Sequence, residues 1–549
     1  MGLLVEYGDY ILSGFVLAVI IRIFTSRKTI RRNGEALRTP PGTLPLVGNG
    51  IKFLQPRWDL LDWFNKCQCQ FGYETLALTV PTFPSAVLIQ DPRNLEFVFK
   101  NESLFTKGAF VKRRSWDLFG NGIINADGDF WKLQRKAGSA FLNTANLKVL
   151  TDVLLPRYIS ESLDDLHLST KRDTVDLQHV FHEITTKLMG KMAYNMEMHA
   201  DDIFSQSFDF ASGATAKRFQ NPLWLVTEYF LGSEFRRSVS AVKEFGRHIV
   251  ANAVQGREEQ TAKDEPTDPD SKVDHISGSL IRSLLDALGD EQIVADAALN
   301  YLSAGRDTTG QALTWTFYLL LQHPEAVTKI RAEVQDLLDQ QMQQQPDSPS
   351  PTLIISSNPP ILNADLTLFT PQSLPYTTAA FHEALRLYPP IPFEFRQAQA
   401  DTTLPDGTFL PRHSVVMWCL WAMQRSQSTW GYDAEDFRPE RFLVCDDEHQ
   451  GQGQSQTQDD QVRENKKNSR HFAVGKSTSE FPVFHGGVRT CLGRKMAEAI
   501  AVQVIPSVVW GFDLEQGWEG PLEGRRSHTS LTLPMEGGLP VKVRRRVVD

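Results

Sequence analysis

The stretch FHGGVRTCLG, residues 484–493, decides what kind of protein this chain is. It holds glycines, one arginine and one thiol at short, fixed spacing. A thiolate that binds a metal must stay deprotonated, and nearby N–H groups, positive charge and a following helix N-terminus favour that state. Gly487, Arg489 and Gly493 meet those needs beside Cys491. For this segment alone, a buried structural cysteine in a turn is the alternative interpretation.

The overall composition is that of an ordinary globular protein. The chain has 549 residues, of which 41% are hydrophobic and 22% charged, so one very large domain or several of typical size would fit. A net charge of −9 provides no basic field for nucleic acid, and we expect no nucleic-acid partner. The five cysteines are scattered and odd in number, which argues against a disulfide framework and for a reducing compartment.

The N-terminus carries a compartment signal. Residues 10–24 are mostly apolar, and four basic residues follow between positions 27 and 32. This pattern predicts an uncleaved, single-pass membrane anchor over residues 1–33, with the rest of the chain facing the cytosol. A cleaved signal peptide fits less well because Glu6 and Asp9 stand where basic residues are expected. An amphipathic or buried helix is the remaining alternative.

The rest of the chain predicts one domain that is mainly α-helical with small β-sheets. Prolines and glycines over residues 34–50 favour an extended hinge, and residues 51–549 form the domain. Its helices are expected at 296–322, 325–340 and 374–388, and its strands at 75–78, 85–90, 415–419 and 530–533. Polar low-complexity composition predicts surface insertions near 258–272, 340–360 and 446–479.

A second motif, AGRDTTG at residues 304–310, lies inside a long helical pattern. Glycine costs about 1 kcal/mol relative to alanine in a helix, and threonine hydroxyls compete for the carbonyl four residues back and distort it. A close helix crossing at Gly305 explains the glycine structurally. The functional alternative is that Asp307 and Thr308 hold water beside a distorted turn and pass protons into a buried site.

Two pairs of polar residues stand one helical turn apart. Glu383 and Arg386 occupy positions i and i+3 just before two prolines, where a solvent-exposed ion pair is the simplest interpretation. Trp131 and Arg135 present an indole N–H and a guanidinium in a spacing that suits one shared anion.

Together these motifs resemble the cytochrome P450 family, whose thiol loop reads Phe-x-x-Gly-x-Arg-x-Cys-x-Gly and whose helix motif reads Ala-Gly-x-Asp-Thr-Thr. The resemblance spans four ordered motifs with the anchor and hinge, and it implies the cytochrome P450 fold. It implies haem b, iron protoporphyrin IX, with Cys491 as the axial ligand of the iron in a loop that begins at Phe484. It also implies a monooxygenase that inserts one atom of O₂ into a C–H bond.

The resemblance assigns further roles by position. Asp307 and Thr308 would handle protons, and the haem propionates would be held by Trp131, Arg135, Arg489 and Arg396. Glu383, Arg386 and Arg441 would be buried scaffold for the Cys491 loop. Two positions depart from the family pattern: Gln424 replaces a frequent histidine before Arg425, which puts a propionate contact there in doubt, and Val488 replaces a common proline.

The substrate is expected to be lipophilic. Segments 381–396 and 121–141 look similar to plant and fungal fatty-acid and alkane hydroxylases, which favours hydroxylation of a long aliphatic chain. A tailoring monooxygenase of fungal secondary metabolism is the alternative. The corresponding pocket residues are mostly apolar, and each fits ordinary core equally well: Phe110, Phe119, Ala304, Ile391, Phe393 and Leu531.

The resemblance also implies partners and a place in the cell. Only 58 residues follow Cys491, so we expect electrons from NADPH through a separate cytochrome P450 reductase, with cytochrome b5 as a second candidate donor. The expected location is the endoplasmic reticulum membrane. Rival classes are a haem-binding protein without turnover, a peroxide-driven isomerase or peroxygenase, and a structural membrane protein without haem.

Overall fold

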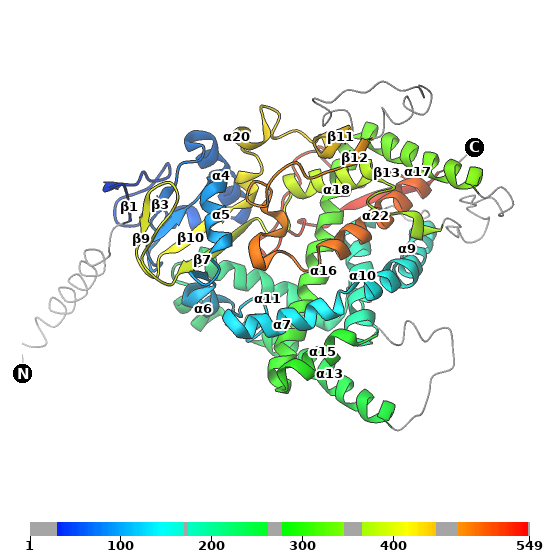
Figure 1. Ribbon diagram of the computed structural model, residues 1–549, viewed down its shortest axis with the longest axis horizontal. Helices are drawn as coiled ribbons and strands as arrows, with labels where there is room; N and C mark the ends of the chain where they lie inside the picture. The colour runs from blue at the N-terminus through cyan, green and yellow to red at the C-terminus, as the bar shows by residue number, and fades with distance from the viewer. Residues whose placement is uncertain (1–29, 170–173, 262–276, 345–364, 446–469, 547–549) are drawn as a thin grey trace, which may run out of the picture.

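The computed structural model describes residues 30–169, 174–261, 277–344, 365–445 and 470–546. Figure 1 shows the larger sheets gathered at one end of the molecule and most helices at the other, with α16 (Glu291–Gln322) running between them. The prediction of a mainly helical domain with small sheets is confirmed.

Among the described residues, the strands form four sheets. The largest has the order β3-β4-β10-β7-β5, and only its β10–β4 pair is parallel. Its strands are β3 (Leu76–Leu78), β4 (Ala86–Leu88), β5 (Phe105–Thr106), β7 (Phe393–Ala398) and β10 (Val415–Cys419). The others contain β1 (Arg31–Arg32), β2 (Glu35–Ala36), β8 (Thr402–Thr403) and β9 (Thr408–Leu410); β6 (Val175–Asp176), β13 (Phe512–Gln516) and β14 (Pro540–Arg545); and β11 (Leu443–Cys445) with β12 (Arg470–Phe472).

The helices form most of the core. Those in the first half of the chain are α3 (Gly50–Phe53), α4 (Arg57–Phe71), α5 (Pro92–Lys100), α6 (Gly108–Phe119), α7 (Gly128–Phe141), α8 (Thr144–Val149), α9 (Leu155–Ser169), α10 (Leu177–Met189), α11 (Ile203–Gln220), α12 (Trp224–Leu231) and α13 (Ser233–Thr261). Those that follow are α15 (Ser279–Leu288), α16, α17 (Pro324–Gln344), α18 (Pro375–Leu387), α19 (Leu420–Met423), α20 (Gln427–Trp430) and α22 (Arg494–Gly511).

Local sequence signals set the limits of the central helices. The Asp290 carboxylate caps α16 by accepting from the N–H of Ile293 at 2.9 Å, and the helix ends just before Pro324. Helix α16 is buried on nearly all sides, and polar residues such as Asp296, Asn300 and Arg306 are buried along with its apolar ones. Helix α18 has Pro375 at its first turn and ends before Pro389. These two helices carry motifs predicted from the sequence.

Some boundaries differ from the sequence prediction. The folded domain starts at Arg31 instead of residue 51, because β1 pairs with β2 and β9, so the expected hinge at 34–50 lies partly on the domain. The strand expected at 530–533 is wrong. That segment is a bend between the bridge partners Ser527 and Met535, and its N–H and hydroxyl groups bond helices instead of a neighbouring strand.

The expected insertions and anchor lie largely outside the described residues. At their edges, α13 continues to Thr261, α17 to Gln344, and β12 covers Arg470–Phe472. Within the described ranges, no helix combines the length and apolarity needed to cross a bilayer. The predicted anchor occupies residues 1–33, of which 1–29 lie outside the described part of the chain.

Candidate functional site

The loop that carries Cys491 is held between α5 and α22. The Cys491 N–H donates to the Phe484 carbonyl at 2.8 Å, and α22 begins at Arg494 just beyond the thiol. Gly487 has a φ of +61°, and a Cβ there would come within 2.3 Å of the Phe99 carbonyl oxygen. Only glycine fits this position, so the glycine of the motif allows the loop to pack closely on α5.

The surroundings of the Cys491 thiol suit a metal ligand. Burial raises the pKa of Cys491, while N–H groups of Gly493 and Arg494 and the charges of Arg135 and Arg494 act in the opposite direction. Cys491 is accessible because it borders a cavity, while protein atoms surround the thiol on its other sides. A bound metal cation would complete the stabilisation of the thiolate, because metal coordination deprotonates a thiol outright.

Two adjoining cavities, of about 280 and 200 Å³, meet at Cys491. Seven residues line both, which makes them parts of one cleft: Ala304, Gly305, Glu394, His485, Cys491, Gly493 and Met496. Helix α16 therefore faces the thiol across the cleft with small residues. Gly305 packs against Met189, since a Cβ on Gly305 would lie 2.5 Å from the Met189 sulfur. The close helix crossing considered for this glycine is present.

The predicted propionate partners lie together along the first cavity. It is lined by Trp131, Arg135, Arg396 and Arg489. The guanidinium of Arg489 lies 4.5 Å from the Trp131 ring centroid, and that of Arg135 lies 5.5 Å from the same ring. The Arg135 guanidinium also donates to the Thr490 carbonyl at 2.8 Å. The other predicted residue, Phe484, lines the second cavity.

These cations differ in how far the protein neutralises them. Arg489 forms ion pairs with Glu102 and, at 3.0 Å, with Asp127. Arg396 pairs with Glu394 at 3.2 Å. Arg135 has no ion pair with any described residue, and the Trp131 indole N–H donates no hydrogen bond within the described residues. Arg135 and Trp131 therefore keep donors available to a ligand.

Lys107 is the functional candidate that sequence reasoning missed. It follows β5, lines the first cavity, and forms no ion pair with a described acid. Burial, with help from the charge of Arg396, lowers the pKa of Lys107 to about 7, although Glu394 opposes this. Lys107 and Arg135 are thus two enclosed cations without acid partners. No family motif marks Lys107; its only signal is a lone lysine before a glycine that begins α6.

The donor set fits a haem. Cys491 supplies a thiolate, the small residues of α16 lie opposite it, and two uncompensated cations with a free indole N–H match two carboxylates. Gln424, in contrast, is buried away from the cleft and donates to the Glu480 carbonyl at 2.9 Å. Gln424 is therefore not placed to contact a propionate, whereas Lys107 lines the cavity that the cofactor would occupy.

The Glu383–Arg386 pair is buried and not exposed to solvent. Both side chains have 0% exposure, and two hydrogen bonds of 2.7 and 2.8 Å join them. The Arg441 guanidinium also bonds Glu383 at 3.1 Å. Arg386 further donates to the carbonyls of Gln424 and Ala434. The network joins α18 to segments that precede the thiol loop.

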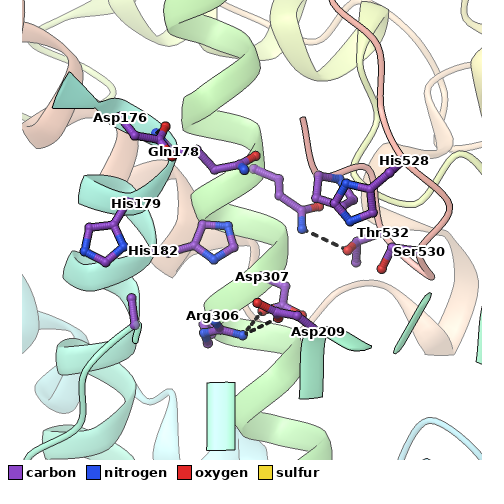
Figure 2. Close-up of a pocket in the computed structure, with 13 residues that line it drawn as sticks. Asp176, Gln178, His179, His182, Asp209, Arg306, Asp307, His528, Ser530 and Thr532 are labelled. Carbon is purple, nitrogen blue, oxygen red and sulfur yellow. Dashed lines mark hydrogen bonds and ion pairs between the residues drawn. The ribbon is translucent and has the colours of Figure 1, made fainter. Parts of the chain in front are cut away.

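The structure separates Asp307 from Thr308. Thr308 lines the cleft at Cys491 and donates to the Ala304 carbonyl at 2.7 Å, yet α16 stays an unbroken α-helix. The expected helix distortion is absent there because the hydroxyl bond adds to the helix ladder without opening it. Asp307 lies in a second, polar pocket of about 190 Å³ on another face of α16 (Figure 2).

The polar pocket lies between α10, α16 and the segment 528–534. Figure 2 shows the Arg306 guanidinium facing two adjacent carboxylates, those of Asp307, at 2.8 Å, and Asp209, at 3.0 Å. Burial raises the pKa of Asp307 to about 7, and the charge of Arg306 opposes the increase. Burial also lowers the pKa of His182, whose Nε2 atom has no hydrogen-bond partner, to about 3. The pocket thus holds a carboxyl of α16, that of Asp307, whose pKa lies near neutrality.

The predicted substrate residues divide into two groups. Ala304 and Ile391 line the cleft at Cys491. Phe110 and Phe393 instead belong to an aromatic cluster centred on Phe395, at 5.6 and 5.8 Å between ring centroids. Phe393 points away from the cleft because alternate residues of β7 face opposite sides of the sheet, and Glu394 and Arg396 face the cleft. Phe119 is buried in the core and Leu531 packs against it.

The comparisons with known proteins agree with this site. Residues 39–536 match the family model for cytochrome P450. The chain is 26% identical to Cytochrome P450 94A1 of Vicia sativa, over 92% of this chain and 91% of that protein. It is 28% identical to Cytochrome P450 86B1 of Arabidopsis thaliana, over 97% and 90%. It is 29% identical to Cytochrome P450 monooxygenase cyp1 of Mycosarcoma maydis, over 92% and 75%.

A haem-thiolate oxidoreductase is the class that the fold and the cleft define. The chain belongs to the cytochrome P450 family, and the resemblance read from its motifs is confirmed. It is a monooxygenase.

Replacing Lys107 with methionine should speed haem loss from the loaded enzyme about tenfold, because one charge-assisted hydrogen bond contributes roughly 1.5 kcal/mol. The measurement is haem transfer to excess apomyoglobin. Lys132→Met, which removes an exposed lysine on α7 paired with Asp129, should leave the rate unchanged. Equal rates for the Lys107 variant and the parent protein would contradict the assignment.

Proposed function

We propose that the enzyme hydroxylates a long aliphatic chain, such as a fatty acid or an alkane. The observation that carries the proposal is the apolar character of the surfaces that face the thiol: Ala304, Gly305 and Ala312 on α16, and Ile391 before β7. Small and aliphatic side chains accommodate a methylene chain, and they outnumber the polar residues of the same cavity, which are Thr308, Thr309, Glu394 and His485. The sequence similarity of segments 381–396 and 121–141 to aliphatic hydroxylases supports the same substrate class.

In this proposal the haem, when bound to Cys491, supplies the oxygen chemistry. One atom of O₂ enters the C–H bond and the other leaves as water, with two electrons and two protons consumed. The chain's own residues then have separate tasks. Lys107, Arg135, Arg396, Arg489 and Trp131 hold the carboxylates of the cofactor.

Protons enter, in this proposal, from the polar pocket. Asp307 takes a proton on the pocket side of α16, held there by Arg306. Thr308, the next residue, has its hydroxyl on the cleft side. The pair passes protons across the helix, and each residue needs the other because successive helical side chains point about 100° apart.

We further propose that the enzyme is bound to the endoplasmic reticulum membrane and receives electrons from NADPH–cytochrome P450 reductase, with cytochrome b5 as a second donor. The apolar segment 10–24 supports an anchor. Helix α12 gives independent support because its acidic side chain faces the protein and its apolar side chains face outward. Glu228 faces inward to the buried Arg218 at 2.7 Å, whereas Phe230 and Leu231 are 74% and 81% exposed. Such an apolar face suits a lipid surface.

The substrate class is tested by adding saturated fatty acids, alkanes and polyketide intermediates to the haem-loaded enzyme and following low- to high-spin conversion. Turnover with reductase, NADPH and O₂ should give hydroxylated aliphatic products. Cys491→Ala should lose both the thiolate-type CO band and the product. Conversion of polyketides alone would favour the tailoring enzyme, and an active, spectrally normal Cys491→Ala protein would contradict the thiolate site.

The proton path predicts a pH dependence. The pKa of Asp307 is raised from 3.8 to about 7, so the native protein holds an extra proton between these values and its free energy of unfolding falls as pH rises through that window. Turnover should decline above about pH 7 as Asp307 ionises. Asp307→Asn should lower kcat about 100-fold and remove this decline, as measured by product formed per NADPH across pH.

Asp209→Asn is the matched control. Asp209 shares Arg306 with Asp307, and its negative charge raises the pKa of Asp307. Removing that charge should move the decline to lower pH with little loss of kcat. A pH profile of Asp307→Asn identical to that of the parent enzyme would rule out Asp307 as the proton donor.

The α12 surface is tested in the full-length enzyme on phosphatidylcholine vesicles. A polarity-sensitive dye on Tyr229→Cys, in a Cys69→Ser background, should show blue-shifted emission and quenching by lipid-borne nitroxides, because Tyr229 is 76% exposed on α12. The same dye on Tyr432→Cys, a 90% exposed position outside α12, should stay in water. Equal emission from the two positions would contradict the contact.

A further inference from the structure

His382 is a buried histidine whose two ring nitrogens both face hydrogen-bond acceptors. It lies on α18 directly before Glu383, and its side chain is 0% exposed. Its Nδ1 atom lies 3.0 Å from the Thr378 carbonyl oxygen, and its Nε2 atom lies 3.1 Å from a carboxylate oxygen of Glu498 on α22. A carbonyl oxygen can only accept a hydrogen bond, so the Nδ1 atom carries a proton.

The second ring nitrogen faces an ionised acid. The Glu498 oxygen that contacts His382 also accepts from the Nε atom of Arg494 at 2.8 Å. Burial acts to raise the pKa of Glu498, but the bonds and charges of His382 and Arg494 outweigh it and leave this pKa below its usual value. An ionised carboxylate has no proton to donate, so the Nε2 atom of His382 carries one as well. The hydrogen bonds therefore describe an imidazolium.

The surroundings of His382 suit a positive charge. Glu498 supplies a full counter-charge, and aromatic faces within about 6 Å attract a cation. A second buried histidine, His182, has no acid partner among the described residues, and burial lowers its pKa to about 3, so it stays neutral. Three ring centroids lie 4.5, 5.8 and 6.0 Å from that of His382, in the order Phe472, Phe442 and Phe484.

The charge lies beside the loop that carries Cys491. Phe484 begins this loop, and its carbonyl accepts the Cys491 N–H at 2.8 Å. The Phe484 ring contacts His382 and also lies 5.2 Å from the guanidinium carbon of Arg494. Arg494 is one of the charges that stabilise the thiolate. Because Glu498 offsets only one of the two cations, the network keeps one net positive charge next to the thiol loop.

The two cations differ in how strongly solvent screens them. The side chain of Arg494 is 39% exposed, whereas that of His382 is 0% exposed. Water and salt screen exposed charges, and buried charges interact more strongly at the same distance. Reduction adds a negative charge to a metal site, and a nearby buried cation stabilises the reduced form. His382 is therefore the cation of this network that affects a metal at Cys491 most.

We propose that His382 is held as an imidazolium by Glu498 and that its charge raises the reduction potential of the haem at Cys491. This role concerns the acceptance of electrons and does not depend on the substrate. Neither His382 nor Glu498 lines the cleft, so His382 acts through the electrostatic field at the iron and not through contact with a ligand.

Redox titration of the full-length, haem-loaded enzyme tests the charge. At a fixed applied potential, His382→Gln should lower the ferrous-to-ferric ratio at least about threefold, because it removes one buried positive charge. The double variant His382→Gln/Glu498→Gln removes one charge of each sign and should restore the parent ratio. Lys495→Gln, which removes an exposed cation from α22, is the matched control and should leave the ratio unchanged. The thiolate-type CO band of each sample verifies that Cys491 still binds the iron.

Each outcome decides the proposal. An unchanged ratio in His382→Gln would mean that His382 is neutral, and the proposal fails. A double variant with a ratio as low as that of the single variant would trace the shift to repacking around Phe484, and the proposal fails again. Should His382→Gln not fold, ring-nitrogen NMR of the parent enzyme in its ferrous CO form, with ¹⁵N-labelled histidine, decides the question. The histidine whose signals move in Glu498→Gln must carry protons on both ring nitrogens, and a single protonated nitrogen overturns the proposal.

Discussion

The buried ion pair between Glu383 and Arg386 is the interaction on which the thiol site depends. Removing two charges from water is costly, and the pair is stable only because every remaining donor and acceptor is used. Arg386 holds the carbonyl of Gln424, and Gln424 in turn holds that of Glu480, four residues before the thiol loop begins. This network therefore holds the loop from the side away from the cleft, and none of its residues lines the cleft.

Helix α16 divides the interior into two chemically different compartments. On one face, small residues and Thr308 border the cleft at Cys491. On another, Arg306 and Asp307 border a polar pocket with histidines. A single helix buried on nearly all sides can serve both because its period places successive residues on different faces. The Arg306–Asp307 pair therefore lies beside the cleft without lining it.

Much of the site could be predicted from the sequence because its parts lie in short motifs with fixed spacing. The thiol loop, the Glu383–Arg386 pair and the Trp131–Arg135 pair are local patterns. Lys107 could not be found in this way, since only tertiary folding brings the end of β5 beside the cleft. The placement of Asp307 and Thr308 on different faces of the helix could have been predicted, because adjacent side chains of a helix point in different directions.

Errors in the fold prediction have similar causes. The segment 530–533 alternates like a strand, but its polar groups bond α11 and α16 instead of a neighbouring strand. The hinge at 34–50 was expected to stand apart because prolines disfavour regular structure. A two-residue strand such as β2 needs no propensity of its own once β1, which itself pairs with β9, provides a partner. In both places, contacts with segments distant in the sequence determined the local structure.

The enclosed cations of this protein differ in whether an acid is paired with them, and this difference indicates which of them are available to ligands. The chain is acidic overall, with 66 Asp and Glu against 57 Lys and Arg, so a missing counter-ion does not reflect a lack of carboxylates. Where a cation only supports the fold, as at Arg218 or Arg386, an acid accompanies it. Arg425 has no acid but lies against two aromatic rings.

Lys107 and Arg135 form no ion pair with a described acid, although Glu394 lies near enough to Lys107 to affect its pKa. An acid paired with either of them would stabilise the empty protein and compete with a ligand for the same charge. In the proposed site, leaving these two cations unpaired keeps them available for the two carboxylates of the cofactor.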